Sequence, residues 1–367
     1  MHWPRPLALG FAALLLPLAA GAQERPAPKR IQVADGVYLF VTAPYGDVGL
    51  DGNAVAILSP GGVLVFDSNG TPPAAAAVIA GIRALTDQPV RYVVNSHWHW
   101  DHWYGTEAYT AAFPGVQVIA QEKSRELMMG PALEFNRPGL ETQLPAYVQS
   151  LEKKVAAAET ATPPPQNLAA MKRLAAEDRF FLDQKTGVHH VFPTVTYANR
   201  MDIYLGGRHI ELLHDDRAIT PGDTFLYLPD DKVLVTGDLL INPITFALDC
   251  YPTGWLRTLE TLDSLDAAVI VPGHGEPMRD KTLLRAHIDV LEEIYKRGRD
   301  AKSRGLDPDQ AKTAMLPGLH DLMVRLTHDD PALNKQFEVY LVDWFLHRVY
   351  DEIDGPLTDA IAPIPKG

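Results

Sequence analysis

Residues 92–104 read YVVNSHWHWDHWY, which places an apolar strand directly before a cluster of side chains that can bind metal. The cluster comprises His97, His99, Asp101 and His102. Imidazole and carboxylate groups suit zinc, with bonds of about 2.0–2.2 Å. Alternation along an extended loop places the first two histidines on one side, and the other two residues can address a second position. A solvated histidine-rich loop is the ordinary alternative, but four potential ligands in six residues favour a metal site.

Two later apolar strands also end in a potential ligand. The segment KVLVTGDLL (232–240) delivers Asp238, and AAVIVPGHGEP (267–277) delivers His274 between two glycines. Short glycine-bearing loops at strand ends present side chains at the edge of a sheet, where several strands can converge on one cleft. Each segment alone could be a simple turn, but together with the first cluster they place six candidate ligands at strand ends.

The order of patterns along the chain predicts a layered α/β fold. Short β-rich runs and one helix precede the cluster, alanine- and charge-rich helical periods fill residues 122–186, strands resume to about residue 271, and the rest is helical. Proline-rich TPPPQ (162–166) divides the middle segment into two helices. We therefore expect two β-rich halves, a helical insertion and a helical tail, with helices interleaved between the strands.

At this point the sequence resembles the metallo-β-lactamase superfamily of zinc-dependent hydrolases, with a motif set like those of glyoxalase II and lactonases. The resemblance rests on HxHxDH (97–102), GD (237–238), PGHG (272–275) and the early LVFDSN (64–69). It implies an α/β fold, an αββα four-layer sandwich, to which this chain adds a helical insertion and a helical C-terminal tail that lie outside the common pattern. With the patterns of the chain itself, we divide the sequence into a signal peptide (1–22), a metallo-β-lactamase-like domain (23–305, with the insertion at 122–186) and a C-terminal helical extension (306–367).

The resemblance also implies roles for the candidate ligands, with one or two Zn²⁺ ions as the cofactor. His97 and His99 would serve a first metal position, Asp238 would bridge, and the second position would use Asp101, His102 and His274. Asp101 and Asp238 would also position the attacking hydroxide as catalytic residues. Asp67 would be the carboxylate that orients a ligand, although capping the turn after its strand is an equally good role.

One position departs from the family pattern. The family usually supplies a further first-position histidine from a segment like G-x-x-H-T-x-G-D, whereas Ile219 stands there in this chain, before Thr-Pro-Gly-Asp (220–223). Isoleucine cannot bind metal, so the first position is one ligand short. His214, or else His189 or His190 of the insertion, could substitute if its segment folds toward the cleft.

These residues predict an enzyme that hydrolyses a small-molecule substrate through metal-activated water. Within the resemblance, an aspartate at position 238 is typical of thioesterases, lactonases, phosphodiesterases and alkylsulfatases, so we rank ester, thioester or lactone substrates first. Hydrolysis of a β-lactam, phosphodiester or sulfate ester is the further alternative. A metal- or ligand-binding protein with a degraded first position and little catalysis is the competing class.

The N-terminal residues 1–22 carry one basic residue, Arg5, then an apolar run and a small-residue A-x-A-like ending, which predicts a signal peptide cleaved before Gln23 and a periplasmic or secreted protein. The formal net charge of the chain is −13. Such a charge disfavours nucleic acid as a partner, and after cleavage we expect no stable membrane insertion. The single cysteine, Cys250, has no partner for an internal disulfide. The oligomeric state is not predicted by the sequence.

Overall fold

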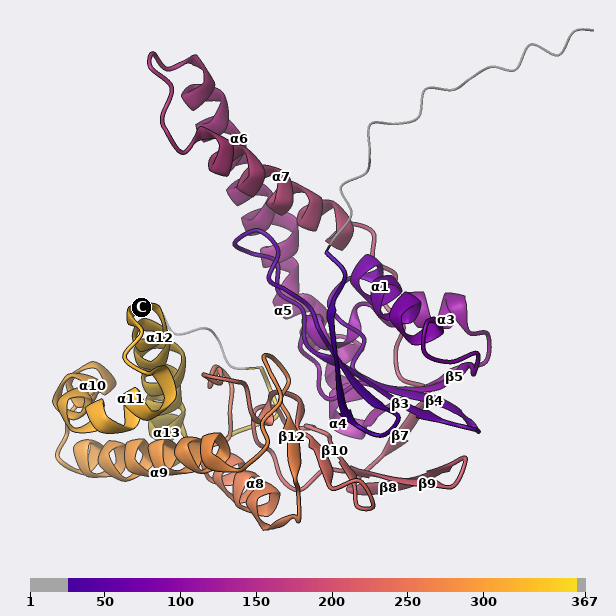
Figure 1. The fold of residues 1–367 in the computed structure, drawn as a ribbon. Coiled ribbons are helices and arrows are strands. Elements are labelled where there is room, and N and C mark those ends of the chain that lie inside the picture. Colours follow the sequence, from indigo (N-terminus) through magenta and orange to yellow (C-terminus); the bar gives the residue numbers. More distant parts are fainter. Residues whose placement is uncertain (1–25, 362–367) are drawn as a thin grey trace, which may run out of the picture.

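A computed structural model describes residues 26–361, so the predicted signal peptide lies outside the described residues. The N-terminal half forms a seven-stranded sheet with its strands in sequence order. Figure 1 labels β3, β4, β5 and β7 of this sheet. Neighbours from β1 to β4 are antiparallel, and neighbours from β4 to β7 are parallel. The strands are β1 (Lys29–Ala34), β2 (Val37–Val41), β3 (Ala54–Ser59), β4 (Gly62–Phe66), β5 (Val90–Val94), β6 (Gln117–Gln121) and β7 (Val195–Tyr197).

A second, five-stranded sheet packs against the first. Its order is β12-β11-β10-β9-β8, antiparallel except for the parallel pair β11 and β12. A buried aliphatic cluster from both sheets, including Leu39, Ile57, Leu212 and Val235, fills the space between them. The strands are β8 (Arg200–Leu205), β9 (Arg208–Leu213), β10 (Phe225–Leu228), β11 (Val233–Val235) and β12 (Val269–Val271).

Helices cover the outer face of each sheet, which confirms the predicted αββα sandwich. Helices α1 (Pro72–Arg83) and α3 (Thr106–Ala112) pack on the first sheet through a cluster that includes Val78, Val93 and Tyr109. The sequence favours α1 at this place because Thr71 caps its first turn, two prolines open it and an alanine run continues it. Helices α8 (Pro252–Ser264) and α9 (Thr282–Ser303) cover the second sheet.

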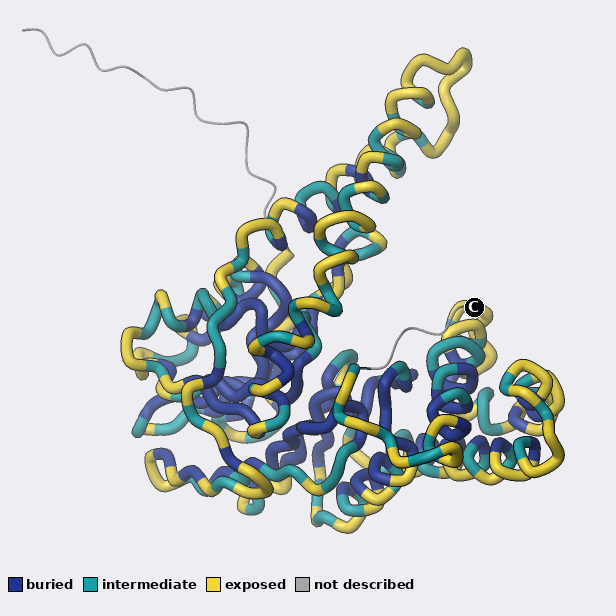
Figure 2. Tube along the Cα trace, turned by 180° about the vertical axis from the view of Figure 1, so that it is seen from behind, coloured by how far each residue is buried: buried dark blue, intermediate teal, exposed yellow. Residues whose placement is uncertain are grey.

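The segment between β6 and β7 is helical and forms a projecting hairpin. Figure 1 shows α6 and α7 as two adjacent helices that extend away from the sandwich, and Figure 2 shows that the far end of this hairpin is largely exposed. Its buried side chains include Val148, Ala175, Phe181 and Leu182, which lie away from the exposed tip. The elements are α4 (Glu122–Met128), α5 (Pro131–Pro138), a π-helical turn (Gly139–Gln143), α6 (Leu144–Thr160) and α7 (Leu168–Lys185).

The C-terminal helices share a core with the second sheet. One buried cluster runs from Ile219 and Ile270 through Trp255 to Phe345 and Tyr350, so the tail packs against the sandwich instead of forming a core of its own. Within residues 26–361, none of the helices combines the length and apolar character needed to cross a bilayer. The elements are α10 (Pro308–Met315), a 3₁₀ turn (Leu316–Leu319), α11 (His320–Thr327), α12 (Pro331–Gln336), a π-helical turn (Phe337–Asp343) and α13 (Trp344–Asp354).

The strand ends place the motif residues at one edge of the sandwich. Asp67 directly follows β4, and His97 is the third residue after β5. Asp238 follows β11 in a 3₁₀ turn (Gly237–Leu239), and His274 is the third residue after β12. Since β4 is parallel to β5 and β11 is parallel to β12, their carboxyl ends point to the same side within each sheet. Residues far apart in the sequence are thereby brought to one cleft.

Candidate metal centre

Three of the predicted ligands form one tight group. Potential ligand atoms of Asp101, His102 and His274 all lie within 4.8 Å of one another. His274 Nε2 is 3.1 Å from Asp101 Oδ2 and 3.3 Å from His102 Nε2, and His102 Nε2 is 3.5 Å from Asp101 Oδ2. Asp101 and His102 lie on the short helix α2 (Trp100–Trp103), directly after the extended loop that carries the first two histidines.

Asp238 lies between this group and the first two histidines. Its Oδ1 is 3.2 Å from His102 Nε2 and 3.5 Å from His274 Nε2, whereas its Oδ2 is 3.6 Å from His97 Nε2. One carboxylate therefore presents one oxygen to each position. This arrangement is the geometry of a bridging ligand.

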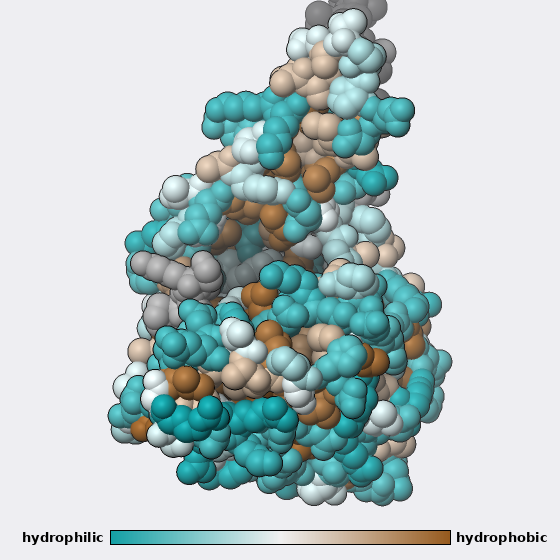
Figure 3. Space-filling view, turned by 90° about the vertical axis from the view of Figure 1, so that its left-hand side faces the viewer, coloured by the Kyte–Doolittle hydropathy of each residue, from teal (hydrophilic) through white to brown (hydrophobic). Residues whose placement is uncertain are grey.

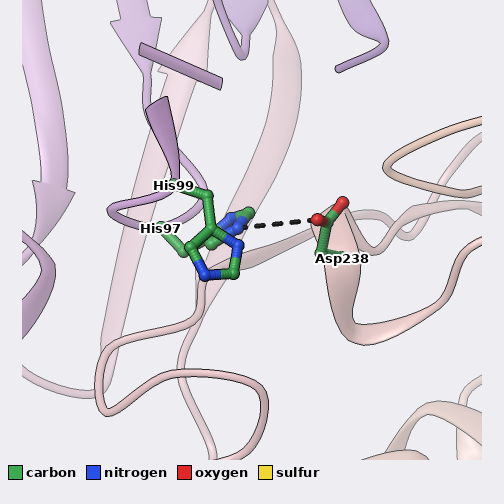
Figure 4. A group of neighbouring side chains, drawn as sticks. All are labelled: His97, His99 and Asp238. Atoms are coloured by element: carbon green, nitrogen blue, oxygen red, sulfur yellow. Dashed lines mark ion pairs between the residues drawn. The ribbon is translucent and has the colours of Figure 1, made fainter. Parts of the chain in front are cut away.

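The other group comprises His97, His99 and Asp238, again with ligand atoms within 4.8 Å of one another. Figure 4 shows the two imidazoles on the loop side and the Asp238 carboxylate approaching from the opposite strand end. The ring centroids of the two histidines are 4.4 Å apart. The structure thus brings together all six residues that the sequence indicated.

Buried hydrogen bonds orient two of the imidazoles. His102 Nδ1 lies 2.8 Å from Asp67 Oδ2, and His97 Nδ1 lies 2.9 Å from the hydroxyl of Ser96. The Ser96 amide and hydroxyl in turn donate to the two Asp67 oxygens, at 2.7 and 2.8 Å. Both histidines therefore direct Nε2 toward the centre, and Asp67 is placed to orient His102 as the partner of a metal ligand would be.

Asp249 is a neighbour of the centre that the sequence reasoning missed. Its Oδ1 lies 3.6 Å from His99 Nε2, and the side chain is buried. It belongs to an irregular segment before α8, with neither a strand end nor a motif to mark it. The only sequence signal is an acidic residue in an otherwise apolar stretch, FALDCY (246–251), and that signal is weak.

The alternative histidines do not reach the centre. His214 Nδ1 lies 2.9 Å from the Asp223 carbonyl oxygen, His189 is exposed beside Glu107, and His190 packs its ring against Trp103. None of the three belongs to a group of potential ligands in the described residues. Ile219, at the position of the family's further histidine, is buried in the apolar core of the second sheet.

The donor set fits metal ions. A tetrahedral site with bonds of about 2.0–2.2 Å has ligand atoms about 3.3–3.6 Å apart, close to the separations of 3.1–3.6 Å found here. The buried Nε2 of His97 makes no hydrogen bond within the described residues. A cation shared by these donors would satisfy it and would reduce the cost of burying two carboxylates side by side.

The same crowding shifts the pKa values of the ligands. Burial opposes protonation of His274, but the Asp238 and Asp101 carboxylates overcome it and raise the pKa of His274 to about 9. For His97, burial and the nearby imidazoles of His99 and His102 hold the pKa well below its usual value. Metal binding would therefore compete with protonation of His274, whereas the imidazole of His97 favours its neutral form.

A cleft of about 320 Å³ opens on this centre, and its walls are mostly apolar. Trp98 and Trp100 of the motif line it, whereas Trp103 and Tyr104 are buried and pack beneath the loop. Figure 3 shows apolar side chains gathered around a hollow below the base of the hairpin. The remaining lining residues are Leu50, His99, Asp101, Phe135, Asn136, Asp238, Phe246, Leu248, His274 and Trp344.

Two further features, an acidic cluster with a histidine on β8 and β9 and the thiol of Cys250, do not indicate a second functional site. Asp202, His209 and Glu211 approach one another on β8 and β9, but Arg200 already pairs with both carboxylates at 2.8 and 3.1 Å. Burial raises the pKa of the Cys250 thiol well above its usual value, so it is not a ready nucleophile.

Comparison with known proteins identifies relatives with the same fold. The chain is 24% identical over 275 residues to the linear primary-alkylsulfatase of Pseudomonas sp. (strain ATCC 19151), which covers 69% of this chain and 48% of the relative. The chain therefore spans about half the length of the curated relative it matches. Among solved structures, a metallo-β-lactamase from Pontibacter korlensis matches with a TM-score of 0.50 and 19% identity, over 72% of this chain and 99% of that one.

The structure of a stereoselective inverting sec-alkylsulfatase from Pseudomonas sp. matches over 90% of this chain and 51% of its own, with a TM-score of 0.57 and 19% identity. The sequence profile of the metallo-β-lactamase superfamily matches residues 47–274, which include every predicted ligand. The chain therefore belongs to the metallo-β-lactamase superfamily, whose members are hydrolases that generally bind zinc.

Proposed function

We propose that this protein is an exported zinc-dependent hydrolase that cleaves an ester, thioester or lactone bearing a sizeable apolar group. The observation that carries the proposal is an aromatic and aliphatic cleft that opens directly on six converging ligands. A mostly apolar pocket with a few convergent polar groups is the usual form of a small-molecule site. Here the polar groups are the metal ligands themselves.

Zinc, when bound, supplies an activated water and a Lewis acid for the electrophilic centre of the substrate. The protein's own carboxylates would then orient the attack. Asp101 and Asp238 present oxygens to the centre and line the cleft, so they can accept hydrogen bonds from the attacking water. Asp67 and Ser96 keep the imidazoles of His102 and His97 fixed, so the geometry is preorganised.

The shape of the cleft supports an apolar substituent on the substrate. Phe135, Phe246, Leu248 and Trp344 form apolar walls of the cleft that opens on the centre. A second cavity of about 170 Å³ shares Trp100 and Asn136 with the cleft and is lined mainly by apolar residues. An alkyl or acyl chain on a substrate bound at the metal centre can therefore extend along the apolar surface of both cavities.

The charges around the cleft help to rank neutral against anionic substrates. Among the described residues, no lysine or arginine lines the cleft at the centre. Lys185 lines the adjoining cavity, and its Nζ lies 2.9 Å from the centroid of the Trp100 ring. Burial holds the pKa of Lys185 well below its usual value. Anionic esters are usually held by arginine or lysine, so this lining favours a neutral substrate.

An alkyl sulfate ester is the second candidate. It is favoured by the sequence match to an alkylsulfatase and by the structural match to another that extends over 90% of this chain. The apolar cleft suits an alkyl chain equally well, and bound metal would have to provide the positive charge for the sulfate group. The family membership alone leaves β-lactam and phosphodiester substrates as further alternatives.

We also propose that the mature protein begins near Gln23 and works in the periplasm or outside the cell. The support is the leader pattern of residues 1–22. A small molecule is the expected partner, and the acidic net charge of −13 argues against nucleic acid. Intact-mass analysis of protein from the native host tests the cleavage, and retention of Met1 would contradict export.

A substrate panel on zinc-loaded protein tests the activity. We expect turnover of p-nitrophenyl octanoate and of a long-chain lactone to exceed that of p-nitrophenyl acetate, sodium dodecyl sulfate and a chromogenic cephalosporin. His274→Ala, which removes a ligand of the second position, serves as the matched inactive control. Faster hydrolysis of dodecyl sulfate would select the second candidate, and one tightly held metal without any turnover would support the binding-protein class.

A further inference from the structure

The first metal position needs a ligand that the family's motif does not supply here. His97 and His99 contribute two imidazoles, and Asp238 is shared with the second position. Ile219 occupies the place of the family's further histidine and is only 1% exposed, inside an apolar cluster. Two ligands, His97 and His99, belong to the first position alone. A zinc ion with three ligands of its own would need one more donor there.

Asp249 has the placement of that donor. Its side chain is 4% exposed, and its Oδ1 lies 3.6 Å from His99 Nε2. That separation is the distance between two ligand atoms on one tetrahedral zinc with bonds of about 2.2 Å. The same oxygen makes no hydrogen bond within the described residues, although it is fully shielded from solvent. A buried carboxylate oxygen without such a bond is costly unless a cation completes it.

The backbone fixes Asp249 beside the loop that carries Ile219. The Tyr251 amide donates to the Ala218 carbonyl oxygen at 2.7 Å, and the Ala247 amide donates to the Tyr340 carbonyl oxygen at 3.0 Å. Arg348 Nε donates to the Cys250 carbonyl oxygen at 2.9 Å. The segment around Asp249 is therefore anchored on both sides, partly by the C-terminal helical region, and delivers its carboxylate next to the position that lost its ligand.

Another buried carboxylate lies in the same neighbourhood but is already satisfied. Asp223 is 4% exposed, and its two oxygens accept hydrogen bonds from the amide and hydroxyl of Thr220, at 2.7 and 2.8 Å. Its geometry is that of a loop-closing aspartate. The contrast leaves Asp249 as the carboxylate with an oxygen available to the first position.

We propose that Asp249 is the third protein ligand of the first metal position and replaces the side chain that the family supplies from position 219. The inference rests on the proposed metal centre and assigns one more residue to it. The first position then consists of two imidazoles and one unshared carboxylate, with Asp238 as the bridge. The C-terminal helices contribute to the centre, because they hold the Asp249 segment in place.

The test compares metal content and metal spectra among variants of the full chain. Wild type, Asp249→Asn, Asp249→His and Asp223→Asn are dialysed against a zinc buffer, and zinc is counted by plasma mass spectrometry. Cobalt-substituted samples report the ligand field through visible absorption. Near-ultraviolet circular dichroism shows whether each variant retains its packing.

We expect wild type and Asp223→Asn to hold two zinc ions per chain. Asp249→Asn should hold one, or bind the weaker ion at least about 10-fold less tightly, since even an outer-sphere partner contributes that much. Asp249→His supplies a donor again and should recover the second ion, with a changed cobalt spectrum. These readouts do not depend on turnover.

Two results would overturn the assignment. Two tightly held ions and an unchanged cobalt spectrum in Asp249→Asn would show that Asp249 is not a ligand. An equal loss of metal in Asp223→Asn would show that the loss reflects disturbance of the loop. A wild-type protein that binds no metal would instead reject the proposed metal centre itself, so the two failures are distinguishable.

Discussion

Replacing Asp67 by asparagine should weaken metal binding at the second position without disturbing the fold. Asp67 has a φ of 63°, in the left-handed region, which asparagine also tolerates, so the substitution introduces little backbone strain. The asparagine oxygen can keep the hydrogen bond from the Ser96 amide. Its amide group then faces His102 Nδ1, where the carboxylate now lies at 2.8 Å.

The magnitude follows from the tautomer of His102. For Nε2 to bind metal, Nδ1 must carry the proton and donate it, and an asparagine NH₂ group cannot accept it. His102 must turn away or protonate the wrong nitrogen. Loss of such a partner costs about 10–100-fold in metal affinity, equivalent to about 1.4–2.8 kcal/mol.

Metal-free stability provides an independent check. Burial raises the pKa of Asp67 and so offsets part of the stabilisation that the ionised carboxylate gains from His102 and Ser96. Asparagine avoids this burial cost but loses the hydrogen bond with His102 Nδ1, so we expect a moderate fall in the urea midpoint of the metal-free protein. The gain in stability on adding zinc should be smaller in Asp67→Asn than in wild type, which separates the loss of zinc affinity from the change in metal-free stability.

Competition with a chromophoric zinc chelator measures the affinity directly. Asp178→Asn is the matched control, because Asp178 is also a buried carboxylate but accepts hydrogen bonds from the Asp47 and Val48 amides. We expect unchanged zinc affinity in that variant. Equal affinities in Asp67→Asn and wild type would refute the orienting role of Asp67.

Three further results are expected. Because the pKa of His274 is raised to about 9, chelator titration should show an apparent zinc affinity that rises with pH up to about 9, with proton release on binding. In metal-free protein, the stability that protonated His274 contributes is fully present below pH 6.5 and is lost as the pH rises through 9. Flat profiles of affinity and stability against pH would contradict this. Phe246→Ala should raise KM for p-nitrophenyl octanoate more than for p-nitrophenyl acetate, and an equal change for both would count against chain binding in the cleft. Burial lowers the pKa of His287 to about 4, so the stability that depends on its neutral form is present above pH 6.5 and falls by up to about 3 kcal/mol as the pH drops toward 4. His287→Leu should remove this part of the pH dependence of the unfolding free energy measured in urea. An unchanged pH dependence in that variant would contradict the role of His287.

The strands and the convergence of the six candidate ligands could be predicted because local sequence determines them. Apolar runs followed closely by Ser96, Gly237 and Gly273 predict strands, and the residues after them lie at a sheet edge. The alternation of His97 with His99 is evident within the six-residue motif. The helical insertion was equally readable, since α6 and α7 have long helical periods separated by prolines. The strand β1 (Lys29–Ala34) could not be predicted from local sequence, because it begins with two charged residues and its conformation depends on pairing with β2.

Asp249 and much of the cleft could not be predicted, because their positions depend on tertiary packing. Asp249 is held near the centre by contacts of its segment with the backbone of residues 218 and 340 and with the Arg348 side chain. Trp344 lines the cleft from the start of α13, although nearly a hundred residues separate it from Asp249. No periodicity or spacing in the sequence reports such contacts. The same holds for Ile219, whose identity shows that a ligand is missing but not where a replacement would come from.

The central claim is that this centre holds metal and uses it for hydrolysis. The most direct measurement is a titration of metal-free protein with zinc in which bound zinc and ester hydrolysis are followed in the same samples. The account predicts that activity is absent without metal, appears as the centre fills, and reaches its maximum at two zinc ions per chain. Full activity in the metal-free protein, or two bound ions with no hydrolysis of any ester, thioester, lactone or sulfate ester, would contradict it.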